Sequence, residues 1–205
     1  MVERQLRRRG ISDGRVLAAM AAVPRELFVG ETLRRRAYAD SALPIEVGQT
    51  ISQPWIVAAI SQALELRGEE RVLEVGTGSG YSTAILARLA AQVISIERHT
   101  ELAEGARRRL AQLGVANVEV VVGDGSVGMP ERAPFEGIAV HATAPARPRT
   151  LLSQLAPAGR LVVPLASDSV DVLTRFRRTP DGLVEEVIGP CRFVPLIGDE
   201  GYRAD

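Results

Sequence analysis

The sequence predicts a single α/β domain with a mostly parallel sheet and helices on both of its faces. From Arg71 onward, short runs of apolar residues alternate with amphipathic helical stretches, which is the pattern of βαβ units around a buried parallel sheet. A glycine-rich turn, residues 76–80, joins the first apolar run to the first of these helices. In open α/β sheets, ligands bind at the carboxyl ends of the strands, beside such a turn. We therefore expect one domain, residues 1–205, with a ligand site at this turn.

The composition of the chain argues against nucleic-acid and membrane partners and against a metal site. The 205 residues are 46% hydrophobic and 24% charged, as in globular proteins, and 25 basic residues balance 25 acidic ones. A balanced chain has no net field that attracts nucleic acid, and no run of about 18 apolar residues offers a membrane span. Two histidines and one cysteine are too few for a zinc site, and one cysteine forms no internal disulfide. We expect a cytoplasmic protein without metal, nucleic-acid or membrane partners.

The N-terminal segment, residues 1–67, is predicted to hold helices and a substrate loop. Asp13 can cap a helix that runs through Ala22. A second amphipathic helix is expected over Ile56–Leu66, and Gly68 ends it.

Strands and helices alternate through the central segment, residues 68–165. Strands are expected at Arg71–Val75, Val93–Ile96, Val118–Val122, Ile138–His141 and Arg160–Pro164, and helices at Ser79–Leu89, Glu101–Leu113 and Arg149–Leu155. The last segment, residues 166–205, has two apolar stretches, Val170–Arg177 and Leu183–Val194, with no helix between them. They predict a terminal antiparallel hairpin with Asp181-Gly182 as its turn.

The spacing of the glycines narrows the ligand. A dinucleotide site needs Gly-x-Gly-x-x-Gly, but here Tyr81 stands at the third glycine position, and Gly80 comes one residue early. The chain has no lysine, so the turn is not a phosphate-binding P-loop. Glu74 ahead of a Gly-x-Gly-x-Gly turn fits the S-adenosylmethionine (AdoMet) site of class I methyltransferases. The residues expected to bind this cofactor here are Glu74, Gly76, Thr77, Gly78 and Gly80.

The next two strand ends carry acids in matching places. Glu97 ends the second strand, about 20 residues past the turn, where a carboxylate can accept hydrogen bonds from both ribose hydroxyls. Asp124-Gly125 follows the third strand, and its carboxylate can accept a hydrogen bond from an adenine amino group. Each motif alone is common in ordinary turns. Together, the three strand ends indicate one AdoMet site, with S-adenosylhomocysteine (AdoHcy) as the product.

The segment ahead of the first strand indicates the substrate. Residues 38–54 read Tyr-Ala-Asp-Ser-Ala-Leu-Pro-Ile-Glu-Val-Gly-Gln-Thr-Ile-Ser-Gln-Pro. This segment resembles the signature of the protein-L-isoaspartate (D-aspartate) O-methyltransferase family, which methylates damaged aspartyl residues. The resemblance covers nearly the whole chain, because later motifs follow in order at residues 72–80, 123–125, 133–135, 144–145, 155–164 and 192–196.

The resemblance implies a class I AdoMet-dependent methyltransferase (Rossmann-like) fold. Its seven-stranded, mostly parallel sheet has helices on both faces, an N-terminal helical cap over the cofactor, and its last two strands in swapped order relative to other methyltransferases. The implied activity is methyl transfer to the α-carboxylate of L-isoaspartyl, or the β-carboxylate of D-aspartyl, residues in damaged proteins, which starts repair through a succinimide. We expect the chain to act as a monomer.

The resemblance also assigns site residues by position. Ser52 matches the essential active-site serine, Thr50 matches a cofactor neighbour, and Ile51, Gln53 and Val194 match substrate-binding positions. From the residues alone, Ser52 is also a candidate N-cap for the helix over Ile56–Leu66, and the two roles are compatible.

A carboxylate acceptor needs little help from the protein. Its reference pKa lies near 4, so it is ionised at neutral pH and needs no general base. In-line attack on a methyl group then requires alignment and desolvation. Ser52 is expected to donate a hydrogen bond that aims one carboxylate oxygen at the methyl group.

Two departures from the family pattern leave alternatives open. Glu46 stands where the family usually has glycine, and His141-Ala142-Thr143 replaces the usual run of small residues. Glu46 beside the substrate loop is expected to repel a substrate carboxylate. One alternative is therefore a carboxyl methyltransferase specific for an aspartate in a biosynthetic peptide. Another is an AdoMet-binding interaction module without activity, against which an intact Ser52 argues.

Overall fold

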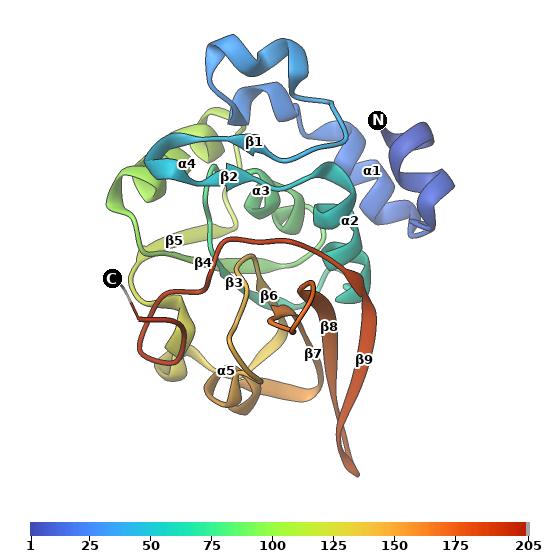
Figure 1. Cartoon of the computed structure of the whole chain (residues 1–205), viewed down its shortest axis with the longest axis vertical. Coiled ribbons are helices and arrows are strands. Elements are labelled where there is room, and N and C mark those ends of the chain that lie inside the picture. The colour runs from blue at the N-terminus through green and yellow to red at the C-terminus, as the bar shows by residue number, and fades with distance from the viewer. Residues whose placement is uncertain (204–205) are drawn as a thin grey trace.

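The computed structural model describes residues 1–203, with a seven-stranded sheet at the centre of the chain (Figure 1). The strands lie in the order β5-β4-β3-β6-β7-β8-β9. Their bounds are β3 Arg71–Val75, β4 Gln92–Glu97, β5 Val118–Val122, β6 Phe135–Val140, β7 Leu155–Leu165, β8 Val172–Thr179 and β9 Gly182–Pro190. The five neighbouring strands β5, β4, β3, β6 and β7 are parallel to one another. Strand β8 is antiparallel to β7, and β9 is antiparallel to β8. The predicted mostly parallel sheet is confirmed.

The last two strands follow chain order, with β8 beside β7 and β9 at the edge of the sheet. This is the strand order that the family resemblance implied. The predicted terminal hairpin is confirmed, but its turn is Pro180-Asp181, and Gly182 at φ 125° already opens β9. The expected strand to Val194 was too long, because β9 ends at Pro190. The chain then leaves the sheet edge and crosses toward the strand ends (Figure 1).

Helices cover both faces of the sheet, as predicted. They are α1 Gly14–Ala22, α2 Pro54–Ala63, α3 Tyr81–Ala87, α4 Thr100–Gln112 and α5 Arg149–Ser153. Strand residues alternate between two buried apolar clusters. Val72 belongs to the cluster with residues of α1, α2, α3 and α4, whereas Leu73 belongs to the cluster with Leu151 and Leu152 of α5.

Two helix starts test the capping predictions. The Asp13 side chain accepts hydrogen bonds from the backbone N–H groups of Arg15 and Val16, so the predicted cap of α1 is confirmed. Helix α2 begins two residues earlier than expected, at Pro54, with Gln53 in the N-cap position. Proline suits the first helical position because that N–H has no partner in the helix. Ser52 is therefore not the N-cap of this helix.

The sequence did not predict the flap, by which we mean residues 43–51. Two short antiparallel strands, β1 Leu43–Pro44 and β2 Thr50–Ile51, form its sides, and Val47 at φ 57° and Gly48 at φ 65° lie in its turn. Strands of two residues are too short to show the alternation of apolar and polar residues that predicts a strand, so the sequence predicts a loop here. The remaining one-turn elements are Val2–Leu6, Arg7–Arg9, Arg25–Phe28, Glu31–Arg36, Glu46–Gly48, Gly125–Val127 and Pro130–Arg132.

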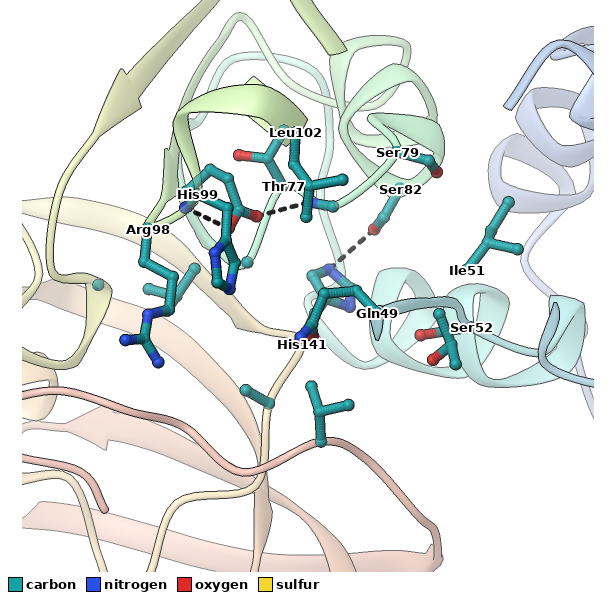
Figure 2. Close-up of a pocket in the computed structure, with 18 of the residues that line it drawn as sticks. Gln49, Ile51, Ser52, Thr77, Ser79, Ser82, Arg98, His99, Leu102 and His141 are labelled. Atoms are coloured by element: carbon teal, nitrogen blue, oxygen red, sulfur yellow. Dashed lines mark hydrogen bonds between the residues drawn. The ribbon is translucent and has the colours of Figure 1, made fainter. Parts of the chain in front are cut away.

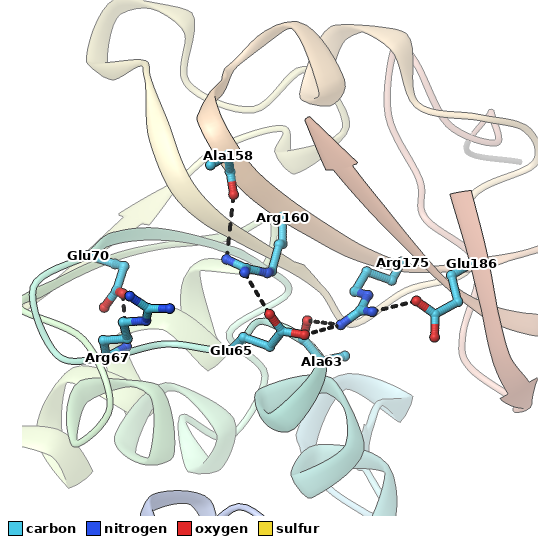
Figure 3. Close-up of polar contacts among 8 residues, drawn as sticks. All are labelled: Ala63, Glu65, Arg67, Glu70, Ala158, Arg160, Arg175 and Glu186. Atoms are coloured by element: carbon cyan, nitrogen blue, oxygen red, sulfur yellow. Dashed lines mark hydrogen bonds and ion pairs between the residues drawn. The ribbon is translucent and has the colours of Figure 1, made fainter. Parts of the chain in front are cut away.

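A cluster of ion pairs fixes the end of α2 against the antiparallel part of the sheet (Figure 3). Glu65, just after α2, binds Arg160 of β7 at 2.6 Å and Arg175 of β8 at 2.7 Å, and Arg175 also binds Glu186 of β9. Burial opposes ionisation of Glu65, but the two guanidinium groups outweigh it and lower the pKa of this carboxyl. The cluster thereby sets where α2, and the segment that leads into it, lies on the sheet.

No helix among residues 1–203 combines the length and the hydropathy that a bilayer span requires.

Candidate active site

A cavity of about 360 Å³ opens at the carboxyl ends of β3, β4 and β6 (Figure 2). The glycine-rich turn after β3, the ends of β4 and β6, the flap and residues 194–197 form its walls. Its size lies in the usual range for small-molecule sites. The predicted ligand site at the turn after the first parallel strand therefore coincides with a real cavity, which we call the inner cavity.

The glycines of the turn serve two different purposes. Gly76, Gly78 and Gly80 have φ values of 91°, 54° and 89°, which favour glycine. Gly76 and Gly78 line the inner cavity, where the bare backbone lets a ligand approach. Gly80 does not line it, and a Cβ there would lie 3.1 Å from the Cβ of Ala106 in α4. The predicted cofactor contact of Gly80 stays a prediction, while its packing role against α4 is clear.

Glu97 is held at the cavity wall by backbone donors. Its Oε2 accepts the N–H of Gly78 at 2.8 Å, and its Oε1 accepts the N–H of His99 at 3.0 Å. Thr77 also lines the cavity, and its hydroxyl pairs with Ser95 at 2.6 Å. Each carboxylate oxygen of Glu97 has a second lone pair free, as an acceptor for ribose hydroxyls needs.

Glu74 lies behind the turn and does not line the cavity. Its side chain is fully buried, and Oε2 accepts hydrogen bonds from the hydroxyls of Thr83 at 2.5 Å and Ser95 at 2.6 Å. Oε1 has no hydrogen-bond partner among the described residues, and Nε2 of His141 lies 3.3 Å from it. Glu74 therefore links the end of β3 to α3 and β4 through these hydrogen bonds, and its contact with the cofactor stays a prediction.

Asp124 and Gly125 are neighbours in sequence but have different roles in the structure. Gly125 lines the inner cavity, and a Cβ there would meet Cγ1 of Val75 at 2.5 Å. The Asp124 carboxylate instead accepts the N–H groups of Ser126 at 2.8 Å and Asp199 at 2.7 Å. Burial would raise the pKa of Asp124, but these hydrogen bonds outweigh burial and lower it. Asp124 does not line the inner cavity, so its predicted adenine contact stays a prediction.

A second cavity, of about 240 Å³, adjoins the first, and we call it the outer cavity. Four residues line both cavities: Thr50, Ser52, His141 and Val194. Ile51 lines only the inner cavity, and Gln53 only the outer one, where its amide donates to Asp40. The site residues that the resemblance assigned thus gather at the junction of two cavities.

The backbone of Ser52 is fixed while its hydroxyl is left free. Nη2 of Arg25, a fully buried side chain, donates to the Ser52 carbonyl at 2.8 Å, and Nε donates to the Ala37 carbonyl at 2.7 Å. The Arg25 guanidinium also lies over the ring of Tyr81, 4.7 Å from its centroid. The Ser52 hydroxyl makes no hydrogen bond within residues 1–203. It is therefore free to donate to a substrate atom.

The outer cavity suits an anionic group. Arg9 and Arg192 line it, and none of its lining residues is acidic, although Arg9 already pairs with Asp40 at 2.7 Å. Cys191 also lines it, but burial, and to a lesser extent Asp171, raises the pKa of this thiol to about 12. The thiol is therefore protonated at neutral pH and is a poor competing nucleophile.

Glu46 has a partner that the sequence did not predict. It lines neither cavity, and its carboxylate binds Arg109 of α4 at 3.1 Å. Arg109 also donates to the carbonyl of Ser79, in the glycine-rich turn. The ion pair fastens the flap to the turn, and the expected repulsion of a substrate carboxylate stays a prediction.

Several cavity residues were not predicted as site residues. They are Tyr81, Ser82, Arg98, His99, Leu102 and His141. His141 could have been found, because it follows an apolar strand in the same way as Glu97 does. Within residues 1–203, no group of three or more histidine, cysteine or acidic side chains is arranged to hold a metal ion.

Comparison with known proteins identifies the family of this chain. The model of the protein-L-isoaspartate (D-aspartate) O-methyltransferase family matches residues 1–201. Protein-L-isoaspartate O-methyltransferase 2 of Pelobacter propionicus is 55% identical over 205 residues, which cover 98% of this chain and 91% of that protein. The Methanoculleus marisnigri protein-L-isoaspartate O-methyltransferase is 50% identical, with 100% and 93% covered.

Solved structures agree with this. A protein-L-isoaspartate O-methyltransferase superposes with a TM-score of 0.86 at 31% identity, covering 98% of this chain and 67% of the other. A Plasmodium falciparum protein described as a member of the same group (PCMT), solved with S-adenosyl-L-homocysteine, gives a TM-score of 0.81 at 26% identity, with 93% and 94% covered. The family match spans nearly the whole chain, and the predicted motifs converge on one site. The chain belongs to the protein-L-isoaspartate (D-aspartate) O-methyltransferase family.

Proposed function

We propose that this chain is an AdoMet-dependent protein carboxyl O-methyltransferase that methylates isoaspartyl residues of damaged proteins, with Ser52 as its catalytic residue. One observation carries the proposal. The inner cavity, whose lining suits AdoMet, meets the outer cavity, which no acidic residue lines, at Thr50, Ser52, His141 and Val194. A methyl group transfers between two bound molecules only where their sites touch. The junction is that place.

The inner cavity fits AdoMet. The Gly76–Gly78 backbone lets a ligand approach closely, and Glu97 offers acceptors for ribose hydroxyls. Gly125 lines the cavity without a side chain. Thr50 and Thr77 complete the set of proposed contacts, while Glu74, Gly80 and Asp124 support it from behind. When bound, AdoMet supplies a methyl group attached to a positively charged sulfur.

Ser52 orients the acceptor. Its free hydroxyl donates a hydrogen bond to the isoaspartyl α-carboxylate and turns one oxygen toward the inner cavity. Ile51, Gln53 and Val194 hold the flanking peptide, and Arg192 attracts the anion. No residue has to remove a proton, because the carboxylate is already ionised at neutral pH. The protein contributes position and exclusion of water, and alignment alone is worth about 7–11 kcal/mol.

The proposal extends to the setting of the enzyme. The chain acts as a monomer in the cytoplasm, on exposed segments of damaged proteins, without a nucleic-acid partner. The balanced charge and the single buried cysteine support this. The proposed domain division is one domain with an N-terminal helical and substrate-loop segment, residues 1–67, an AdoMet-binding core, residues 68–165, and a segment with the C-terminal hairpin, residues 166–205.

Replacement of Ser52 by alanine tests the mechanism. We expect S52A to bind AdoHcy within about threefold of the wild type and to lose at least about tenfold in kcat/KM for an isoaspartyl peptide, since one hydrogen bond to a charged group is worth about 1.5–3 kcal/mol. Calorimetry and transfer of labelled methyl measure the two. S153A, which removes an exposed hydroxyl from α5, is the control.

Paired peptides test the substrate class. An isoaspartyl peptide and its normal aspartyl twin are offered to the wild-type protein. Turnover of the aspartyl twin alone would favour a biosynthetic-peptide enzyme, and AdoHcy binding without turnover of either would favour a binding module. Unchanged kcat/KM in S52A would remove Ser52 from the mechanism.

A further inference from the structure

His141 lies at the junction of the two cavities, and the reaction described above gives it no role. It follows β6 and lines both cavities, with 6% of its side chain exposed. Figure 2 shows its ring directed toward Ser82 of α3. The resemblance implied a small residue at this position, and His141 departs from that expectation. Its position makes it a neighbour of whatever Ser52 binds.

One ring nitrogen of His141 is committed to the protein. Nε2 lies 2.8 Å from the hydroxyl of Ser82 and 3.3 Å from Oε1 of Glu74. Oε1 is buried and has no hydrogen-bond partner among the described residues, whereas Oε2 already has two hydroxyl donors. Since Oε1 of Glu74 makes no hydrogen bond with the ring, the hydrogen bond between Nε2 and the Ser82 hydroxyl is the one that fixes the imidazole, and Nε2 can accept it.

The other ring nitrogen is then available to substrate. Nδ1 makes no hydrogen bond within residues 1–203. The charged or titratable groups that line the two cavities with it are Tyr81, Glu97, Arg98 and His99 on the inner side and Arg9, Cys191 and Arg192 on the outer side. The outer group includes no acid that would compete with a substrate carboxylate.

We propose that His141 is a second carboxylate-binding residue, one that holds the substrate oxygen which Ser52 does not aim at the methyl group. The inference rests on the proposed function. With Nε2 accepting the hydroxyl of Ser82, the proton of the neutral imidazole lies on Nδ1, which donates it in a hydrogen bond to the substrate carboxylate. Methylation removes the anionic charge of the substrate, so the neutral ester is held less tightly.

Three variants of one position separate this role from simple packing. H141A removes the ring, and we expect kcat/KM for the isoaspartyl peptide to fall about tenfold, chiefly through KM, which corresponds to roughly 1.4 kcal/mol. H141N keeps a donor near the place of Nδ1 and is expected to recover about half of that loss on a logarithmic scale. H141L fills the space without a donor and is expected to behave as H141A does. Imidazole added to H141A is expected to restore part of the rate.

The controls distinguish failure of this inference from failure of the proposed function. Wild-type turnover of the isoaspartyl peptide is measured first and tests the function alone. AdoHcy binding by all three variants is expected to stay within about threefold of the wild type, since the lost contact is with substrate. An H141A enzyme with unchanged kcat/KM, an H141L enzyme as active as H141N, or parallel losses of AdoHcy affinity would each overturn the role. Should H141A fail to fold, the comparison of H141N with H141L decides.

Discussion

Gly125 offers the sharpest test of how the inner cavity is built. A Cβ at this position would lie 2.5 Å from Cγ1 and 3.4 Å from Cβ of Val75. Apolar carbons pack best at about 3.5–4.0 Å, so the first contact is about 1 Å too short. Val75 cannot easily give way, because it is β-branched and only 1% exposed in β3. The G125A variant must therefore displace the strand end or the turn after β5.

The cost follows from this overlap. Overpacking of a buried site costs about 1–3 kcal/mol. For a chain of this size, that corresponds to a fall in Tm of about 2–12 °C, at roughly 2–4 °C per kcal/mol. Val75 and Gly125 both line the inner cavity, so part of the strain also appears as lost cofactor affinity. We expect AdoHcy to bind about tenfold more weakly, which corresponds to about 1.4 kcal/mol.

The matched control is two residues away. A Cβ at Gly123 would meet nothing closer than Cγ2 of Ile96, at 3.9 Å, which is ordinary van der Waals contact. G123A is therefore expected to keep both Tm and AdoHcy affinity, measured by thermal denaturation and calorimetry. If G125A and G123A behaved alike, the packing of Gly125 against Val75 would not set the shape of the cavity.

Two further predictions concern the flap and acid stability. E46Q removes the ion pair to Arg109, and stopped-flow measurement is expected to show AdoHcy leaving about 1.4- to fivefold faster, because a partly exposed pair is worth about 0.2–1 kcal/mol. E119Q, which breaks a surface pair with Arg132, is the control, and equal rates in both would mean that the flap is not fastened at Glu46. Hydrogen bonds from Asp199 and Ser126 outweigh burial and lower the pKa of Asp124, so its contribution to stability is complete above about pH 4 and is lost as pH falls through the lowered value. D124N is therefore expected to lose less Tm than the wild type between neutral pH and about pH 3, and an identical loss would contradict this.

The sheet was predictable because its signals are local and repeated. Residues 71–75 and 118–122 are apolar runs of strand length, and the structure begins and ends β3 and β5 at those residues. The order of β8 and β9 came only from the family resemblance. Strand order depends on long-range packing, here including the ion pairs of Glu65 with Arg160 and Arg175, which no local pattern reveals.

The site was predictable in its location more than in its contacts. Glycine spacing located the inner cavity, but it could not tell that Glu74 lies behind the turn, because burial of a strand-end acid depends on its neighbours in other strands. The flap escaped prediction because its strands have two residues each. The ion pair of Glu46 with Arg109 joins positions 63 residues apart, so no local pattern in the sequence indicates it. The sequence suggested only repulsion of the substrate, whereas in the structure the side chain holds the flap against α4.

The segment after β9 has a consequence for biosynthesis. The backbone of Thr143 pairs with Val194 and Leu196 at 2.8 Å in each case, and Asp199 donates to Asp124. The segment that completes the wall around the donor is thus synthesised after every strand of the sheet. A nascent polypeptide that reaches only Pro190 holds all seven strands but lacks this wall, so the sheet can form before the site is complete.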